Sequence, residues 1–512
     1  MPTPRKSKQN TINFAHSRTK PRTYLYAAFL LTLATLAPHA PGFEPASREV
    51  PDARLTPAVE AFAAQNYAEA EARLRALLDD HPESFILHYN LACALSMQGD
   101  TDRALEHLML AARFGFTDGP IMRRDPHLAA VRDTEGFRAL DARWDDLLRA
   151  HADAEYQRLQ QQFGPTYHYH RDDDRRLLYA VAYDRDIFEQ ARAEIDRTHA
   201  WFARAVEPTV EHAEPGDAWI SIILPSRPDF ERWARQRFGP AGAGDFFDIG
   251  GEYHHDRKQL VAADLGPTLR HEYAHVLHWR HNTRLAQRHP VWIQEGLCSL
   301  PEDLEPDPQT ALDRAVPNWR TNSTKRLASA LALPPVRDFV RIPRDRFTSH
   351  RPLANYAIAR TIMLFLEDRG QLRDFYRIYT ETIEDDPTGY RALIEVSGLS
   401  AHEFDRAFRL WLRDLPEVRE RVARGSASLG VEVEAGTGLG PVVVSILRPR
   451  AERRDFPLRT GDTITAINAR PVRDLAELIR VLADYQPGDT VEITLRRGNQ
   501  TETTRVQLVP RS

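Results

Sequence analysis

One short run of residues in the sequence has the composition and spacing of a metal site. His271-Glu272-Tyr273-Ala274-His275 carries two histidines four positions apart. On a helix this spacing places both imidazoles on one face, one turn apart, where they can bind the same Zn²⁺ at about 2.0–2.1 Å. Glu272 lies beside them, and a carboxylate in that place can deprotonate a metal-bound water. The run therefore predicts a zinc site with Glu272 as general base.

A second segment offers the third ligand. Val291-Trp292-Ile293-Gln294-Glu295-Gly296 places Glu295 twenty positions after His275, on a second predicted helix. A carboxylate there completes a His₂Glu site and leaves the fourth position for water. With 20 histidines in 512 residues, the five-residue run arises by chance in about one such chain in twenty. The alternative, an accident of a helix surface, requires the second segment to be accidental too.

The order of these segments along the chain resembles a known clan. A Gly-Gly-x-Tyr segment and an extended segment precede the histidine run, and Pro-x-Trp-Ile-x-Glu-Gly follows it: Gly250–Tyr253, Gln259–Ala262 and Pro290–Gly296. Over about residues 165–415 the chain resembles the gluzincin zinc peptidases, and more narrowly the peptidase-MA-like group. The resemblance implies an α+β zincin-like domain in which His271, His275 and Glu295 bind Zn²⁺. It also implies that the strand ending at Ala262 is the edge along which an extended substrate aligns.

The sequence departs from this family just after the third ligand. Where members often continue Gly-Leu-Ala-Glu, this chain has Gly296-Leu297-Cys298-Ser299. If the lost acid normally orients a ligand histidine, Ser299 or another group must replace it. Cys298 is open to two interpretations, a thiolate ligand or a buried small hydrophobic residue, and the sequence favours the second.

Peptide hydrolysis also needs a donor for the oxyanion of the tetrahedral intermediate. Tyr356 is our candidate, because it begins an amphipathic segment, Asn355–Leu366, from which family members can face the site. The alternative is a tyrosine of the core or rim. Tyr253 and His350 are the other candidates.

A helical pattern with an internal repeat precedes this domain, at residues 57–148. Asn66-Tyr67-Ala68-Glu69-Ala70 recurs as Asp100-Thr101-Asp102-Arg103-Ala104, so Ala70 and Ala104 are 34 residues apart. This period, with small alanines where paired helices approach closely, resembles tetratricopeptide repeats. An ordinary helical bundle with a chance echo is the alternative, because only two repeats match.

Residues 428–509 predict a small β-rich domain. We expect strands and one helix at Val442–Leu447, Thr463–Ile467, Asp474–Ala483 (the helix), Thr490–Leu495 and Thr503–Leu508. Leu429-Gly430-Val431 and Leu458–Ile464 resemble a PDZ domain of the bacterial protease-associated type. The resemblance implies that a peptide carboxylate binds the backbone of the Leu-Gly loop while the peptide adds as a strand beside Val431–Val433. The alternative role for this domain is a packed regulatory lid.

The first 40 residues read as an export signal. Six basic and no acidic residues precede the 14-residue apolar stretch Tyr24–Ala37, which is shorter than the roughly 20 residues of a membrane-spanning helix. A cleaved signal peptide and an uncleaved N-terminal anchor both remain open. We expect a periplasmic or cell-envelope location.

Composition limits the function classes. Lys and Arg total 68 against 73 Asp and Glu, a net charge of −5, which argues against a general nucleic-acid binder. The sequence as a whole predicts a multidomain exported zinc metallopeptidase acting on proteins or peptides. The alternative is a scaffold that retains zinc, no longer cleaves, and binds proteins through its repeats and its PDZ domain.

Overall fold

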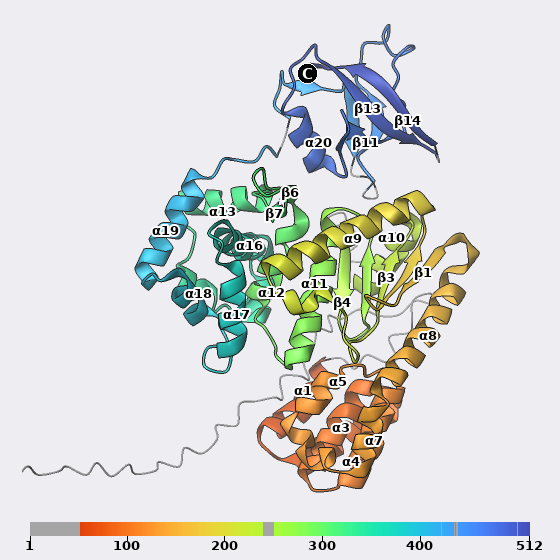
Figure 1. Ribbon diagram of the computed structural model, residues 1–512, viewed down its shortest axis with the longest axis vertical. Helices are drawn as coiled ribbons and strands as arrows, with labels where there is room; N and C mark the ends of the chain where they lie inside the picture. The colour runs from red at the N-terminus through yellow and green to blue at the C-terminus, as the bar shows by residue number, and fades with distance from the viewer. Residues whose placement is uncertain are drawn as a thin grey trace, which may run out of the picture.

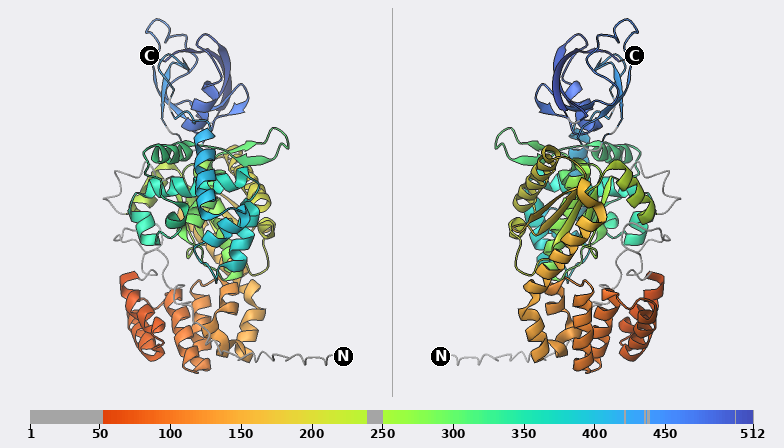
Figure 2. Two further views of the ribbon diagram at one scale, coloured as in Figure 1. Left: turned by 90° about the vertical axis from the view of Figure 1, so that its left-hand side faces the viewer. Right: turned by 90° about the vertical axis from the view of Figure 1, so that its right-hand side faces the viewer.

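The computed structural model describes residues 52–238, 250–420, 422–434, 436, 439–498 and 500–511. The export signal predicted at residues 1–40 lies outside them. The described chain forms three bodies along one long axis, with α-helices at one end, a mixed α/β body in the middle and a β-rich body at the other end (Figures 1 and 2). Among the described residues, no helix is long and apolar enough to cross a bilayer.

The first body consists of helical hairpins. Its elements are α1 (Asp52–Ala63), α2 (Tyr67–Asp80), α3 (Phe85–Met97), α4 (Thr101–Arg113), α5 (Gly119–Arg124), η3 (Pro126–Leu128), α6 (Ala129–Arg132), α7 (Glu135–Ala142), α8 (Trp144–Phe163) and η4 (Gly164–Thr166). Asn66 and Asp100 cap α2 and α4 in the same way, each accepting a hydrogen bond from the main-chain N–H three residues on. Ala70 and Ala104 are both fully buried where the helices meet. The two sequence segments 34 residues apart therefore form equivalent helix caps and equivalent helix–helix contacts.

Helix α3 is covered by its own chain. Tyr89 Oη donates to Asp125 Oδ2 at 2.8 Å, and Cys93 contacts the same carboxylate. Asp125 precedes η3, so this segment occupies one face of α3. The first body therefore does not offer α3 as an open groove.

The middle body contains a five-stranded sheet followed by helices. Its elements are β1 (His168–Asp172), β2 (Leu177–Val181), α9 (Arg185–Ala205), η5 (Pro208–Glu211), β3 (Ile220–Leu224), α10 (Arg227–Phe238), β4 (Gly251–His254), β5 (Gln259–Ala262), α11 (Pro267–Leu285), α12 (Val291–Cys298), η8 (Leu300–Glu302), β6 (Leu304–Pro306), β7 (Asp313–Ala315), α13 (Trp319–Ser329), α14 (Val336–Phe339), α15 (Arg344–Ser349), α16 (Pro352–Asp368), α17 (Leu372–Thr382), α18 (Tyr390–Ser397) and α19 (Ala401–Asp414).

The sheet has the strand order β1-β2-β3-β5-β4, with β2, β3 and β5 parallel and the two outer strands antiparallel to their neighbours. All residues of β2, β3 and β5 are buried, as expected for parallel strands covered on both faces. The prediction that the strand ending at Ala262 forms the edge of the sheet is therefore wrong. β5, which ends at Ala262, is an interior strand, and β4 is the outer strand on that side.

The two faces of the sheet belong to different cores. One face, with Tyr179 and Leu260, packs with α9 and α11. The opposite face, with Ile223 and Val261, packs with α8 and α10 in a core that continues into the first body. The β4–β5 turn also contacts that body, because Lys258 Nζ lies 3.0 Å from Asp118 at the start of α5.

The third body has its own core and its own sheet. Its elements are β8 (Ala427–Ser428), β9 (Val431–Glu434), β10 (Val442–Ile446), β11 (Thr463–Ile467), β12 (Arg470–Pro471), α20 (Leu475–Leu482), β13 (Thr490–Arg497), β14 (Gln500–Gln507) and β15 (Val509–Pro510). The strand order is β14-β13-β11-β10-β9. The four predicted strands and the helix all form, within a few residues of the predicted bounds.

Candidate metal centre

Helices α11 and α12 bring the three predicted ligands together. His271 and His275 project from α11, and Glu295 from α12, with their ligand atoms within 4.8 Å of one another. The Nε2 atoms of His271 and His275 are 3.2 Å apart, and Glu295 Oε2 lies 3.5 and 3.6 Å from them. Three tetrahedral ligands at about 2.0–2.1 Å from a zinc ion would be about 3.3–3.4 Å apart. The donor set and its spacing therefore fit Zn²⁺.

A close approach of helices fixes the position of Glu295. The next residue, Gly296, faces α16, and a Cβ there would lie 2.9 Å from the Ala359 carbonyl oxygen. Glycine thus allows α12 to pack against the α16 backbone. Ile293 and Leu297 of α12 are fully buried on the same core.

The charges at the centre favour a cation. Burial alone would raise the pKa of Glu295, but His275 and His271 outweigh it and lower that pKa. Burial disfavours a charged His271, but Glu295 and Glu302 outweigh it and raise its pKa to about 10. The carboxylates therefore hold positive charge at this point, which a divalent ion can supply.

Glu272 is fixed by the outer strand of the sheet. The main-chain N–H of Tyr253 on β4 donates to Glu272 Oε2 at 2.8 Å. Gly251 lets β4 lie this close, because a Cβ there would come within 2.4 Å of the Val261 carbonyl oxygen and 3.0 Å of Thr268 on α11. Burial raises the pKa of Glu272, although His271 and His275 oppose that shift. A raised pKa suits a base that must accept and later release a proton.

Glu302 is a site residue that the sequence analysis missed. Its Oε1 lies 3.0 Å from His271 Nδ1, and the Arg320 guanidinium holds both of its oxygens, at 2.8 and 2.9 Å. Ser299 does not take this part, because its hydroxyl donates to the main-chain oxygen of Glu295. Glu302, on η8, therefore supplies the acid that the family resemblance placed at Ser299. A carboxylate on the second nitrogen of a ligand histidine fixes its tautomer and orientation.

Of the candidate oxyanion donors, Tyr356 lies nearer the centre electrostatically than Tyr253 and His350. The carboxylate of Glu295 is the largest cause that raises the pKa of Tyr356, followed by burial, which places Tyr356 within electrostatic reach of the centre. The Tyr253 hydroxyl instead contacts His255 Nδ1 at 3.3 Å, and His350 is exposed at the end of α15. Cys298 is fully buried, and burial raises the pKa of its thiol well above the ordinary value. In the described part of the chain it is not a member of the ligand cluster.

Three further histidines are buried nearby, two of them on α11 and one, His289, just after it. His278 Nε2 lies 2.9 Å from His289 Nδ1, and His281 Nδ1 lies 2.9 Å from the Tyr376 hydroxyl. All three are buried, and burial is the main cause that lowers their pKa values. They are neutral packing residues of the core.

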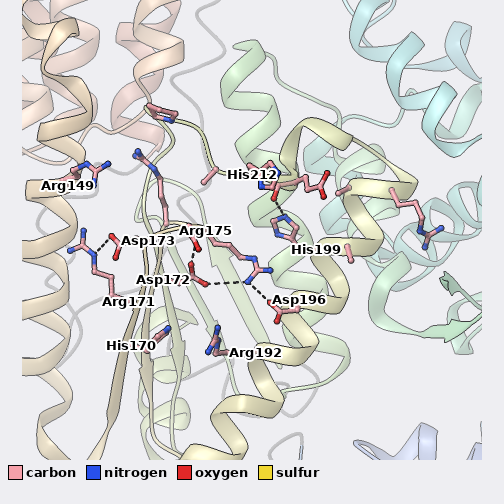
Figure 3. A pocket seen from close by; sticks show the side chains of 18 residues that line it. Arg149, His170, Arg171, Asp172, Asp173, Arg175, Arg192, Asp196, His199 and His212 are labelled. Atoms are coloured by element: carbon pink, nitrogen blue, oxygen red, sulfur yellow. Dashed lines mark hydrogen bonds and ion pairs between the residues drawn. The ribbon is translucent and has the colours of Figure 1, made fainter. Parts of the chain in front are cut away.

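A large polar cavity of about 1150 Å³ lies beside α9 and the β1–β2 turn (Figure 3). Its charges largely neutralise one another. Arg171 pairs with Asp173 at 3.0 Å, and Arg175 pairs with Asp196 at 2.7 Å. His199, on its wall, contacts the hydroxyl of Tyr273, which is a residue of α11. The cavity therefore offers no clear charge preference for a ligand.

Comparisons with known proteins identify the two outer bodies. Residues 61–120 match a tetratricopeptide repeat model, and residues 427–508 match a PDZ domain model. The repeats and the PDZ domain are thus present. A stretch of 51 residues is 39% identical to a probable periplasmic serine endoprotease DegP-like of Rhizobium meliloti (strain 1021), covering 10% of this chain and 10% of that protein.

The likeness of the chain to a solved structure is weaker. The chain is similar to the crystal structure of an aminopeptidase N family protein from Idiomarina loihiensis, with 14% identity and a TM-score of 0.23. The match covers 66% of this chain and 65% of that one. At this TM-score the likeness does not establish a shared fold. The assignment of the centre therefore depends on its own geometry.

Proposed function

We propose that the chain is an exported zinc-dependent peptidase of the gluzincin type. The observation that carries the proposal is the convergence of His271, His275 and Glu295 at tetrahedral spacing, with Glu272 beside them. Zn²⁺ bound there would polarise a water molecule and the scissile carbonyl. The DegP-like similarity agrees with a role in protein cleavage or protein binding.

In this mechanism the residues of the chain each have a defined role. Glu272 takes a proton from the attacking water and delivers it to the leaving amine. Tyr356 donates to the oxygen that gains negative charge during the attack. The outer strand β4 would align an extended substrate along its outer edge, because among the described strands it pairs with β5 alone. The repeats and the PDZ domain would select or present the protein substrate.

Metal removal tests the proposal. The purified protein should contain about one zinc per chain. Dialysis against a chelator should abolish cleavage of a denatured protein, and stoichiometric zinc should restore it. Zinc at 100 times its Kd should also stabilise the chain by about 2.7 kcal/mol, which a thermal melt would detect. Stoichiometric zinc and a normal melt without any cleavage would instead establish the non-catalytic scaffold, and absence of zinc binding would refute both.

Tyr356→Phe tests the oxyanion donor. Loss of one such hydroxyl should lower kcat about 10²–10³-fold while zinc content and KM change little. Tyr390→Phe, on α18 of the same body, is a matched control that should retain full activity. A wild-type kcat in the Tyr356 variant would show that the tyrosine has only a packing role. Its ring lies edge-on to that of Phe347, with the ring centroids 5.6 Å apart.

A further inference from the structure

Two arginines at and just before α20 pair the PDZ domain with the middle body, in addition to the pairs Arg496–Asp184 and Arg227–Glu434. Arg473, just before the helix, reaches Glu194 of α9 at 2.8 Å. Arg480, two turns further on, reaches Asp303 at 2.7 Å and Glu305 at 3.1 Å. Figure 1 shows α20 at the end of the PDZ domain that faces β6, β7 and α9. The carboxylates of Glu194 and Asp303, which pair with these arginines, are connected to the metal centre through hydrogen bonds.

The first arginine connects to the residue before a zinc ligand. Glu194 binds Arg473 through Oε1 and Arg270 through Oε2, the latter at 2.6 Å. Arg270 is 2% exposed and directly precedes His271 on α11. Its guanidinium also donates to the carbonyl oxygens of Pro301, at 2.7 Å, and Glu302. Arg270 therefore ties η8 to α11, with its charge shared with Glu194.

The second arginine connects to the same segment. Asp303 accepts from Arg480 on Oδ1 and from the Asn318 side-chain amide on Oδ2, at 2.9 Å. The same amide lies 3.4 Å from Glu302 Oε2. Glu302 Oε1 in turn contacts His271 Nδ1. Both connections thus converge on residues 301–303, which present Glu302 to the ligand histidine.

The carboxylates of these contacts are buried, where an ion pair has a larger effect on free energy than at the surface. Glu194 is 7% exposed and Asp303 is 8% exposed. Removing Arg473 would leave Glu194 paired with Arg270 alone, and removing Arg480 would leave Asp303 with only the neutral Asn318 amide, so each loss weakens the compensation of a buried charge. Hydrogen bonds in a buried series also polarise one another, so the loss of one bond weakens its neighbours in the series.

We propose that Arg473 and Arg480 of the PDZ domain are positioning residues of the metal centre. Docking of α20 holds residues 301–303 in place, and through them holds Glu302 against His271. This inference rests on the proposed zinc site. It assigns the PDZ domain a part in building that site, separate from any peptide that its own groove binds.

The test is the zinc affinity of the full-length, metal-free chain, measured by competition with a chromogenic chelator. The double variant Arg473→Ala/Arg480→Ala should bind zinc about 10–100-fold more weakly, the range for loss of groups that orient ligands. Arg470→Ala is the matched control, because Arg470 pairs within the PDZ domain with the exposed Asp484. It should bind zinc like wild type.

A double-mutant cycle separates positioning from a general loss of stability. Glu302→Gln alone should weaken zinc binding, and adding the two arginine changes should then have a much smaller effect than in wild type. Fully additive effects, or wild-type affinity in the double arginine variant, would overturn the inference while leaving the proposed function intact. A wild-type chain that binds no zinc would overturn both.

Discussion

Glu272→Gln should keep its zinc and lose nearly all cleavage, with kcat falling about 10²–10⁴-fold or below detection. Glutamine retains an oxygen that can accept the Tyr253 N–H, so β4 should stay in place. It cannot take a proton from water. Because burial already raises the pKa of Glu272, a neutral side chain there should not destabilise the fold. The measurements are zinc content by mass spectrometry and steady-state cleavage of a denatured protein.

The control for this change is Glu395→Gln, which removes an exposed carboxylate from α18 of the same body. It should be as active as wild type. Full activity in the Glu272 variant would refute the proposed mechanism even if zinc is present. Loss of zinc together with activity would mean that Glu272 supports the site instead of acting as the base.

Glu295→Ala should abolish both zinc binding and activity. The variant keeps two imidazoles but loses the carboxylate that both Nε2 atoms face at 3.5 and 3.6 Å. Since loss of a group that merely orients a ligand costs 10–100-fold in metal affinity, loss of the ligand should cost more than ~100-fold. The measurement is the zinc dissociation constant by chelator competition.

Glu395→Ala is a suitable control for this second change, because Glu395 is an exposed acid of α18 in the same body and lies outside the ligand cluster. It should bind zinc within a few-fold of wild type. Wild-type zinc affinity without Glu295 would mean that the third ligand is another residue, and the His₂Glu assignment would fail.

The sequence revealed the parts of the centre that depend on local geometry. The spacing of His271 and His275 specifies a shared helix face, and both project together in the structure. Glu295 lies on another helix, so its position twenty residues after His275 made it a candidate and the family resemblance supported it as a ligand. Neither the spacing nor the family resemblance could predict Glu302. Its contact with His271 depends on how the short η8 turn packs against α11.

The edge strand was mispredicted although the sequence held the relevant signal. Leu260-Val261-Ala262 is continuously apolar, which is typical of an interior parallel strand. Gly251–His254 mixes glycine with polar residues and is only partly buried, as suits the outer position. The strands of the PDZ domain were easier to predict, since β-rich segments there are separated by clear Gly and Pro turns.

The core that joins the first body to the underside of the sheet has a practical consequence. Leu159 of α8, Trp233 of α10 and Ile223 of β3 belong to one continuous set of buried side chains. A fragment trimmed to residues 165–415 would lose α8 from that side of the sheet and expose apolar side chains to water, which lowers solubility. The helices of the first body are therefore not a separable module, and in a calorimeter they should melt together with the sheet of the middle body.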